Sequence, residues 1–404
     1  MSDEGRRTHG FRRRTPLGDA RETLLDAVTP HERAERIALR DADERVLATV
    51  VDAERAVPEY RRAAADGFAV RAEDTFGASG RSPAALQVGE AVGPGTATRV
   101  ERGSELPEAA DAVVTVDATE RRGDSLTVFD AVAGGENVAT VGEDVAAGQK
   151  LYEAGHRLRP SDLGLLKSVG RTTVKVYERP HVSVIPTGEA LVESDPDPGE
   201  AVETDGQTVA QYVERWGGDA TQRDVADDEE AIREAIERDL DRDVVVTTGG
   251  TSVGARDRVP EVVDSLGEVL GHGVALEPGG SVALGVVQGT PVLLLPGPPV
   301  ACLVAAMAFL RPVLRERGHL PHGDPPTTEA ALTRKVVSDP GTRTFARVEL
   351  DGTGDDVTAT PTRASGAGIL SSVALADGWV VVPERLEGLD AGQTVAVEDW
   401  EWSA

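Results

Sequence analysis

Glycine and hydroxyl residues follow an apolar run in the segment GGTSVG at 249–254. Glycines in such a loop let backbone N–H groups approach a phosphate, and Thr251 and Ser252 add hydroxyl donors. Asp257, three residues further on, supplies a carboxylate that could hold a cation beside that phosphate. An ordinary turn is the alternative, because glycine-rich loops are common. The segment therefore indicates either a phosphate site or a plain strand-to-helix turn.

Two shorter segments, TGEA at 187–190 and PGPP at 296–299, also come directly after apolar runs. Taken singly, each fits the start of a helix better than a functional site. Asp227 and Asp228 precede a helical pattern and fit helix capping in the same way. The sequence contains no spacing typical of a Ser-His-Asp triad, a glycosidase carboxylate pair or a Walker phosphate loop.

The elements that must position these turns alternate in type. Apolar runs at 181–186, 243–248 and 291–295 predict buried strands, and residues 205–217 and 228–239 have helical periodicity. This alternation is the pattern of an open, mainly parallel α/β sheet. Ligands bind beyond the carboxyl ends of the strands in such sheets. We therefore expect the three glycine turns to converge on one crevice.

The rest of the chain predicts three further regions. Residues 15–49 are predicted as helix, with Thr15 and Pro16 as its start, and a helical pattern returns at 145–178. Short valine runs between Gly, Pro and Asp turns predict a β-rich segment inserted between them. The predicted multidomain α/β organisation is a helical N-terminal domain at 1–49 and 145–179, an inserted β-rich domain at 50–144, an α/β domain at 180–322 and a small C-terminal β-domain at 323–404.

The composition excludes several classes of protein. The net charge is −28, and only four basic residues are lysines. A phosphate-tracking protein needs a basic face, so we expect no nucleic-acid binding, and we interpret the acid excess as halophilic adaptation. The single cysteine, Cys302, excludes an intramolecular disulfide framework and lies in an apolar stretch. Prolines interrupt the long apolar stretch at 291–310, so we expect a cytoplasmic protein without membrane spans.

The order of the motifs resembles the molybdopterin molybdenumtransferase family, of the MoeA and gephyrin E-domain type. The resemblance covers essentially the whole chain, from FRRRTP at the N-terminus onward. Its motifs, in order, are PEYRRAAADGFAV at 58–70, LPEAADAVV at 106–114, GEDVAAG at 142–148, TGEAL at 187–191, GGTSVGARD at 249–257, PGPPV at 296–300 and GILSS at 368–372.

The resemblance implies a molybdopterin-binding α/β domain among four subdomains, and a homodimer. Its active cleft would lie between the α/β domain of one subunit and the N-terminal part of the other. Adenylylated molybdopterin and molybdate would be the substrates, with Mg²⁺ as cofactor, and AMP would be released as molybdenum enters the dithiolene. The implied catalytic carboxylates are Asp66, Asp144, Asp227 and Asp257, with Asp257 as the metal ligand. The implied substrate-binding residues are Thr187, Gly188, Glu189, Gly249, Gly250, Thr251, Ser252, Gly254, Pro296 and Gly297.

Several positions depart from the family pattern. Glu189 and Ala190 stand where the family has two acids, so one carboxylate is missing. Glu277 and Gly280 stand where it has two lysines. Other changes place Pro298 for Asn, Ala367 for Ser, Arg102 for Thr, and Arg61 to Ala64 for a segment with an acid and a hydroxyl. Two alternatives to a transferase therefore stay open: a non-catalytic paralogue that binds or delivers the cofactor, and an interaction scaffold.

Overall fold

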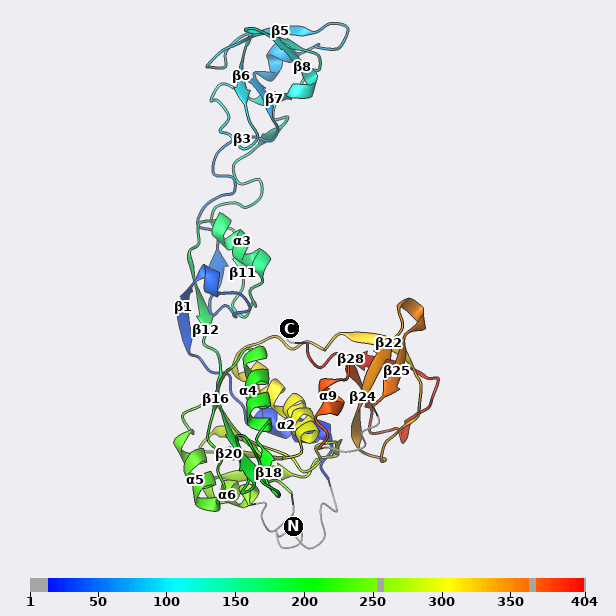
Figure 1. The fold of residues 1–404 in the computed structure, drawn as a ribbon. Coiled ribbons are helices and arrows are strands. Elements are labelled where there is room, and N and C mark those ends of the chain that lie inside the picture. The colour runs from blue at the N-terminus through cyan, green and yellow to red at the C-terminus, as the bar shows by residue number, and fades with distance from the viewer. Residues whose placement is uncertain (1–13, 253–257, 363–367, 403–404) are drawn as a thin grey trace. The chain divides into compact units, whose positions relative to one another are not determined.

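The computed structural model describes residues 14–252, 258–362 and 368–402. Its contacts divide the chain into two compact units. The major unit comprises residues 1–35 and 177–404, and the minor unit comprises residues 36–176. Figure 1 labels many of the elements of both units.

The N-terminal segment differs from the sequence prediction. Helix α2 covers only Leu17–Asp26, and Ala34–Ala38 forms strand β1, so the prediction of a helix through 15–49 was wrong beyond Asp26. Pro30 explains the early end, because proline disfavours helical conformation in the residue before it. The buried face of α2, with Leu24 at its centre, packs into the same core as the α/β sheet. This segment therefore belongs to the major unit.

A six-stranded, mainly parallel sheet forms the centre of the major unit. Strands β13, β16, β17 and β21 pair in parallel, and β20 and β18 extend one edge in antiparallel fashion. The predicted open α/β sheet is confirmed, as is the strand, turn and helix across 291–310. In spatial order the strands are β16 (Asp219–Gln222), β13 (His181–Pro186), β17 (Val244–Thr248), β21 (Thr290–Leu295), β20 (Ala283–Val287) and β18 (Glu268–His272).

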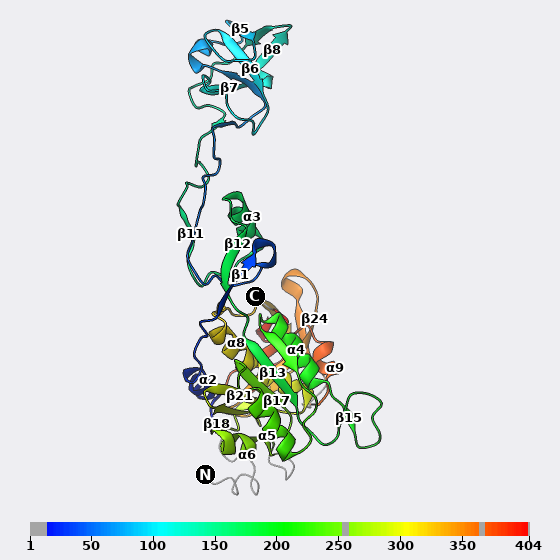
Figure 2. The ribbon, with the colours of Figure 1, turned by 90° about the vertical axis from the view of Figure 1, so that its left-hand side faces the viewer.

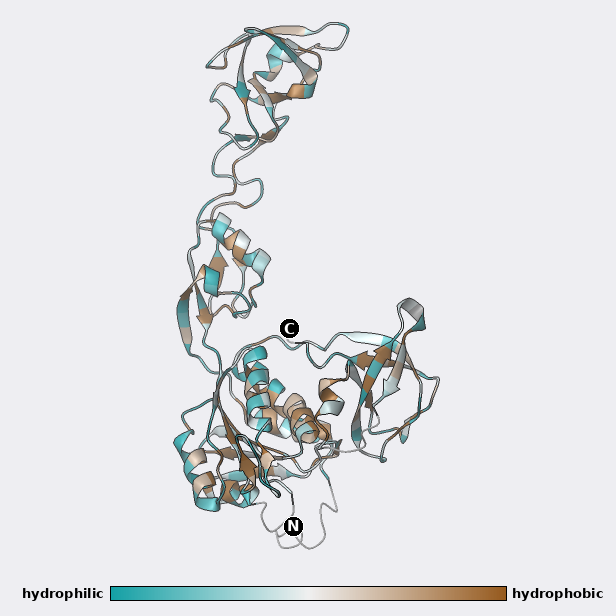
Figure 3. Ribbon diagram, in the orientation of Figure 1, coloured by the Kyte–Doolittle hydropathy of each residue, from teal (hydrophilic) through white to brown (hydrophobic). Residues whose placement is uncertain are grey.

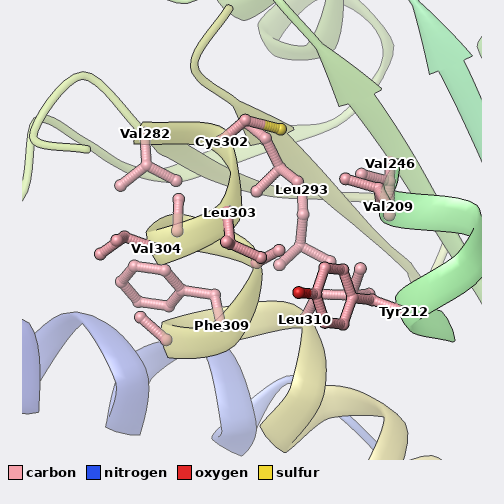
Figure 4. Close-up of a cluster of buried hydrophobic side chains, with 14 of the residues drawn as sticks. Val209, Tyr212, Val246, Val282, Leu293, Cys302, Leu303, Val304, Phe309 and Leu310 are labelled. Carbon is pink, nitrogen blue, oxygen red and sulfur yellow. The ribbon is translucent and has the colours of Figure 1, made fainter. Parts of the chain in front are cut away.

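Helices cover this sheet and bury its apolar strands. In Figure 3 the strands are mainly hydrophobic, whereas α4 carries many hydrophilic residues. Figure 4 shows Val246 and Leu293 of the sheet in one apolar cluster with Phe309 and Leu310 of the helical segment after β21. Cys302 lies in this core at 1% exposure, as predicted. The helices are α4 (Asp205–Arg215), α5 (Glu229–Arg238), α6 (Val259–Leu266), α7 (Pro299–Ala305), the π-helical segment η4 (Ala306–Leu310) and α8 (Arg311–Arg317).

The C-terminal part of the major unit is a small β-barrel. Five strands pair in a closed ring, which leaves no free sheet edge among them. In ring order they are β24 (Arg343–Asp351), β25 (Thr358–Pro361), β22 (Thr327–Leu332), β28 (Thr394–Glu398) and β26 (Gly378–Val382). The short elements near them are β19 (Leu276–Glu277), which pairs with β24, β23 (Val336–Val337), β27 (Gly388–Leu389), η5 (Gly354–Asp356) and α9 (Ser371–Ala374).

The minor unit contains the predicted β-rich insertion. Its six-stranded sheet has the order β7-β4-β6-β5-β9-β8. These strands are β4 (Gly67–Val70), β5 (Ala84–Val88), β6 (Thr96–Val100), β7 (Ala112–Thr115), β8 (Thr119–Arg122) and β9 (Ser125–Val128). The flanking elements are η1 (Leu39–Asp41), β2 (Val51–Asp52), β3 (Arg62–Ala63), η2 (Ala72–Thr75), η3 (Val116–Ala118), β10 (Val138–Ala139), β11 (Lys150–Tyr152), α3 (Pro160–Ser168) and β12 (Thr173–Tyr177).

Candidate active site

The carboxyl ends of three parallel strands carry the three glycine turns. Strands β13, β17 and β21 lie side by side in the sheet (Figure 2). Thr187 N–H donates to the Thr248 carbonyl at 2.8 Å, and Gly249 N–H donates to the Leu295 carbonyl at 2.9 Å. A Cβ on Gly297 would lie only 3.3 Å from the Gly249 Cα. The three turns therefore meet at one place, as the alternation of strands and helices predicts.

Glycine is required in the central turn for two reasons. Gly249 and Gly250 have φ angles of +96° and +66°, which side-chain-bearing residues rarely adopt. A Cβ on Gly249 would lie 2.5 Å from the Thr187 carbonyl oxygen, and one on Gly250 would lie 2.6 Å from the Val259 side chain. Among the described residues, none accepts a hydrogen bond from Gly250 N–H. As far as the described residues are concerned, this N–H is available to a ligand.

A pocket of about 440 Å³ opens at these turns. Seven of the predicted site residues line it, together with Asp228, Glu229 and Arg258. Its walls thus combine carboxylates, one guanidinium and bare glycine backbone. The predicted residues that line it are Thr187, Gly188, Glu189, Asp227, Gly249, Gly250 and Gly297.

The two adjacent acids at the start of α5 have different roles. Asp228 occupies the N-cap position, and its Oδ1 accepts a hydrogen bond from Ala231 N–H at 2.8 Å. Helix capping therefore explains Asp228. The exposed Asp227 side chain makes no hydrogen bond or ion pair with any described residue and faces the pocket. Capping therefore does not account for Asp227.

Arg258 and Glu229 are pocket residues that the sequence analysis missed. The Arg258 guanidinium lies 3.2 Å from a Glu229 carboxylate oxygen, and both side chains are about half exposed, at 56% and 50%. Their position next to Asp257 and Asp228 was the only available signal, since neither forms a motif of its own. Arg258 is the one cation lining the pocket within the described ranges.

Other predicted residues lie apart from the pocket or outside the description. Thr251 is 1% exposed, and its hydroxyl lies 3.3 Å from the Ser281 hydroxyl instead of lining the pocket. Pro296 is also buried and does not line the pocket, and Ser252 is exposed beyond it. Gly254 and Asp257 lie outside the described residues, as does Ala367.

Asp66 and Asp144 belong to the minor unit. Asp66 directly precedes β4, is exposed, and accepts a hydrogen bond from Arg102 N–H at 2.9 Å. Asp144 is also exposed, and its N–H donates to the Val57 carbonyl at 3.0 Å. Both carboxylates are thus held on turns and face solvent within their own unit.

A second acidic group lies at the start of α4. Burial and the neighbouring charge of Glu203 raise the pKa of Asp205 to about 7, while a hydrogen bond from Thr204 opposes the rise. Glu203 accepts hydrogen bonds from Gly206 N–H at 2.6 Å and from Gln222 Nε2 at 3.1 Å. Burial, together with Asp205 and Glu203, raises the pKa of the Cys302 thiol. Cys302 is therefore a protonated, inert core residue.

The residues of the pocket are compatible with a magnesium ion that is coordinated mainly by substrate phosphates and water. No group of three or more His, Cys, Asp or Glu side chains among the described residues converges to hold a metal ion. Mg²⁺ is usually bound through one or two carboxylates together with substrate phosphates and water. The Asp227 carboxylate lines the pocket without a hydrogen-bond or ion-pair partner among the described residues, and it is compatible with that donor set.

No helix in the described part of the chain has both the length and the apolar composition needed to cross a bilayer.

The chain has the open α/β sheet and strand-end pocket of a ligand-binding α/β fold. Three family models match the chain and identify its family. They describe the MoeA N-terminal region (domains I and II) at residues 15–170, a probable molybdopterin binding domain at 183–316 and the MoeA C-terminal region (domain IV) at 329–400. The chain belongs to the MoeA family of molybdopterin biosynthesis proteins.

Relatives match over nearly the whole chain. Molybdopterin molybdenumtransferase 2 of Mycobacterium tuberculosis is 34% identical, covering 90% of this chain and 94% of the relative. The molybdopterin molybdenumtransferase of Bacillus subtilis is 31% identical, covering 91% and 92%. A crystal structure of the molybdopterin biosynthesis MoeA protein from Pyrococcus horikoshii superposes with a TM-score of 0.82 at 30% identity, covering 96% of this chain and 100% of that one.

Proposed function

We propose that this protein is a molybdopterin molybdenumtransferase. It binds adenylylated molybdopterin in the pocket at the ends of β13, β17 and β21, cleaves the adenylate to release AMP, and inserts molybdenum from molybdate into the dithiolene. The observation that carries the proposal is that one pocket holds the Gly250 N–H and the Asp227 carboxylate, neither of which has a hydrogen-bond partner among the described residues. The names of the relatives support the same reaction.

In this proposal the positive and N–H groups of the pocket bind phosphate, and a carboxylate binds the metal ion. Gly250 N–H and the guanidinium of Arg258 donate hydrogen bonds to phosphate oxygens. The amino end of α5 adds the partial positive charge of its unpaired N–H groups. Asp227 holds Mg²⁺, with Asp257 as its predicted second ligand. When bound, the metal ion neutralises phosphate charge and polarises the bond that breaks.

Asp66 and Asp144 are the catalytic carboxylates that the family resemblance implies in the minor unit. We propose that the protein is a homodimer in which the minor unit of one subunit completes the pocket of the other. Their exposure on ordered turns supports this role, because a carboxylate that serves another subunit must face outward.

AMP release tests the transferase proposal directly. The full-length protein is incubated with adenylylated molybdopterin, Mg²⁺ and molybdate in molar KCl, and AMP is quantified. We expect AMP release that depends on both Mg²⁺ and molybdate. Binding of the pterin without AMP release would instead identify a non-catalytic paralogue.

Mixing two inactive variants tests the shared site. Asp66→Asn and Asp227→Asn proteins are inactive alone if both carboxylates act. Random exchange of subunits then restores roughly a quarter of wild-type activity, because half of the dimers carry one intact site of two. No recovery after verified subunit exchange would contradict a site built from two subunits.

A further inference from the structure

A second pocket of the major unit is lined by four arginines. It has a volume of about 270 Å³ and lies between α2, α8 and the C-terminal barrel. Arg21 comes from α2, Arg311 and Arg315 from α8, and Arg343 from β24. It shares no residue with the pocket at the strand ends. We call it the arginine pocket.

Arg311 is buried in this pocket and has no acidic partner among the residues that the structure describes. It is 6% exposed, and its guanidinium lies over the rings of Trp216 and Trp402, at 5.9 and 5.3 Å from their centroids. One nitrogen donates to the Trp402 carbonyl at 2.8 Å, but Nε is buried without a hydrogen-bond partner. No carboxylate of the described residues lies within ion-pair distance of Arg311. A buried cation in this state is costly unless a counter-charge arrives.

The charges on the pocket wall repel one another. Burial and the charge of Arg315 lower the pKa of Arg311 to about 10, and the more distant Asp399 offsets this in part. Burial and the charge of Arg343 likewise lower the pKa of Arg21. These four cations share one small space in a protein whose net charge is −28. The local excess of positive charge is therefore opposite in sign to the rest of the molecule.

Among the described residues, the acidic side chains near the arginine pocket offset only part of its positive charge. Arg343 is paired with Glu384 at 3.0 Å, yet its Nε is buried with no hydrogen-bond partner among the described residues. Glu398, on the pocket wall, accepts a hydrogen bond from Trp379 Nε1 at 2.9 Å. Asp324 is the other acidic residue of the wall and is exposed. Arg21 donates to the Ala308 carbonyl at 3.0 Å and has no carboxylate within ion-pair distance among the described residues.

We propose that the arginine pocket binds a small, doubly charged oxyanion of the sulfate or phosphate class, held by Arg21, Arg311 and Arg343. Guanidinium groups present paired N–H donors that match such oxyanions. The volume holds one tetrahedral anion with a few waters. Because its ligands come from α2, α8 and β24, the bound anion links the N-terminal helix and the C-terminal barrel to the α/β domain. This site does not depend on the proposed transferase activity.

Titration calorimetry with inorganic anions tests the proposal. The full-length protein is titrated with sulfate, and separately with phosphate, at constant ionic strength set by KCl. We expect one site per chain with a dissociation constant below about 1 mM, with chloride competing only weakly. Tighter binding of one of the two anions shows whether the pocket selects sulfate or phosphate. The absence of saturable binding by both would overturn the proposal.

Variants distinguish anion binding in the arginine pocket from non-specific effects of the anion on the protein. Arg21→Gln and Arg343→Gln retain the buried Arg311 and should weaken anion binding at least tenfold each. Arg40→Gln, at an exposed position of the minor unit, is the matched control and should bind as wild type. Sulfate stabilises many proteins by exclusion from their surface, so thermal melts are compared as well. If sulfate binds and stabilises Arg21→Gln and Arg343→Gln as much as wild type, the anion lies elsewhere.

Discussion

The Arg258 guanidinium lies 3.2 Å from the Glu229 carboxylate at the wall of the pocket that follows the three parallel strands. The only cation described in this pocket is therefore already paired with an acid of the same pocket. Exposed ion pairs of this kind contribute roughly 0–1 kcal/mol, so a phosphate can displace Glu229 at small cost. We therefore expect this pair to influence how strongly the pocket binds an anion.

This relationship predicts opposite effects for its two members. Glu229→Gln leaves Arg258 without its acid, so affinity for molybdopterin should rise about threefold. Arg258→Gln removes the cation, so affinity should fall about tenfold, or 1.4 kcal/mol. Titration calorimetry measures both, and Glu230→Gln, a neighbouring acid of α5 that does not line the pocket, is the control. Equal affinities in all three variants would show that Arg258 does not contact the phosphate.

Asp227 and Asp228 should separate activity from stability. Asp228→Ala removes a helix cap and should lower the free energy of unfolding by about 1 kcal/mol. Asp227→Asn should leave unfolding unchanged but reduce Mg²⁺-dependent AMP release at least about 10²-fold, or 2.7 kcal/mol of transition-state stabilisation. Denaturant unfolding and AMP assays on both variants check this. If Asp227→Asn releases AMP as fast as wild type, the assignment of Asp227 as a metal ligand is wrong.

Substitution of Gly250 should affect binding as well as stability. Gly250→Val places a branched side chain where a Cβ already lies 2.6 Å from Val259, so binding of the pterin should weaken at least about tenfold. Gly289→Val is a suitable control, because Gly289 has a positive φ of +89° but no atom within 4 Å of an added Cβ. Both variants should lose stability, and calorimetry should find weaker binding only in Gly250→Val. Wild-type affinity in the Gly250 variant would place the ligand elsewhere.

Asp205 should make stability fall as pH rises. Its pKa is about 7 in the folded protein and about 4 in the unfolded chain, so the folded state binds the extra proton between these values. Stability is therefore highest below about pH 4 as far as this group is concerned, and falls as pH increases to about 7. Asp205→Asn removes the penalty and should stabilise the protein by about 1 kcal/mol or more at pH 8, with a smaller gain at pH 5.

Urea unfolding of wild type and Asp205→Asn at several pH values measures this difference. Glu203→Gln is the companion variant, because Glu203 is the neighbouring charge that raises the Asp205 pKa. A gain that is the same at pH 5 and pH 8 would show that the effect of Asp205→Asn is not electrostatic.

Salt should stabilise the folded protein. With a net charge of −28, self-repulsion opposes the compact state at low ionic strength, and added salt screens it. The midpoint of thermal unfolding should rise from dilute to molar KCl. A flat or falling midpoint would remove the halophilic interpretation of the composition.

Much of the α/β framework was predictable because its signals are local. Runs such as 181–186 and 291–295 are apolar over the length of a strand, and a buried parallel strand has that pattern whatever surrounds it. The helix predicted at 15–49 was wrong beyond Asp26 because the structure of that part depends on a distant segment of the chain. Residues 34–38 form β1 through pairing with β12, some 140 residues away, and no local pattern records that partner.

The sequence by itself determined the strand, glycine turn and helix alternation, and therefore the position of the pocket, because parallel strands must end at the same edge of their sheet. Only the tertiary structure decided which residues next to the glycine turns line the pocket and which are already used in packing or capping. Asp228 caps a helix whereas Asp227 has no partner in the described part of the chain, and Thr251 is buried while Arg258 lines the pocket. Likewise, it alone brought Arg21, Arg311 and Arg343 together from distant elements. Such choices depend on side-chain packing between segments that the chain order keeps far apart.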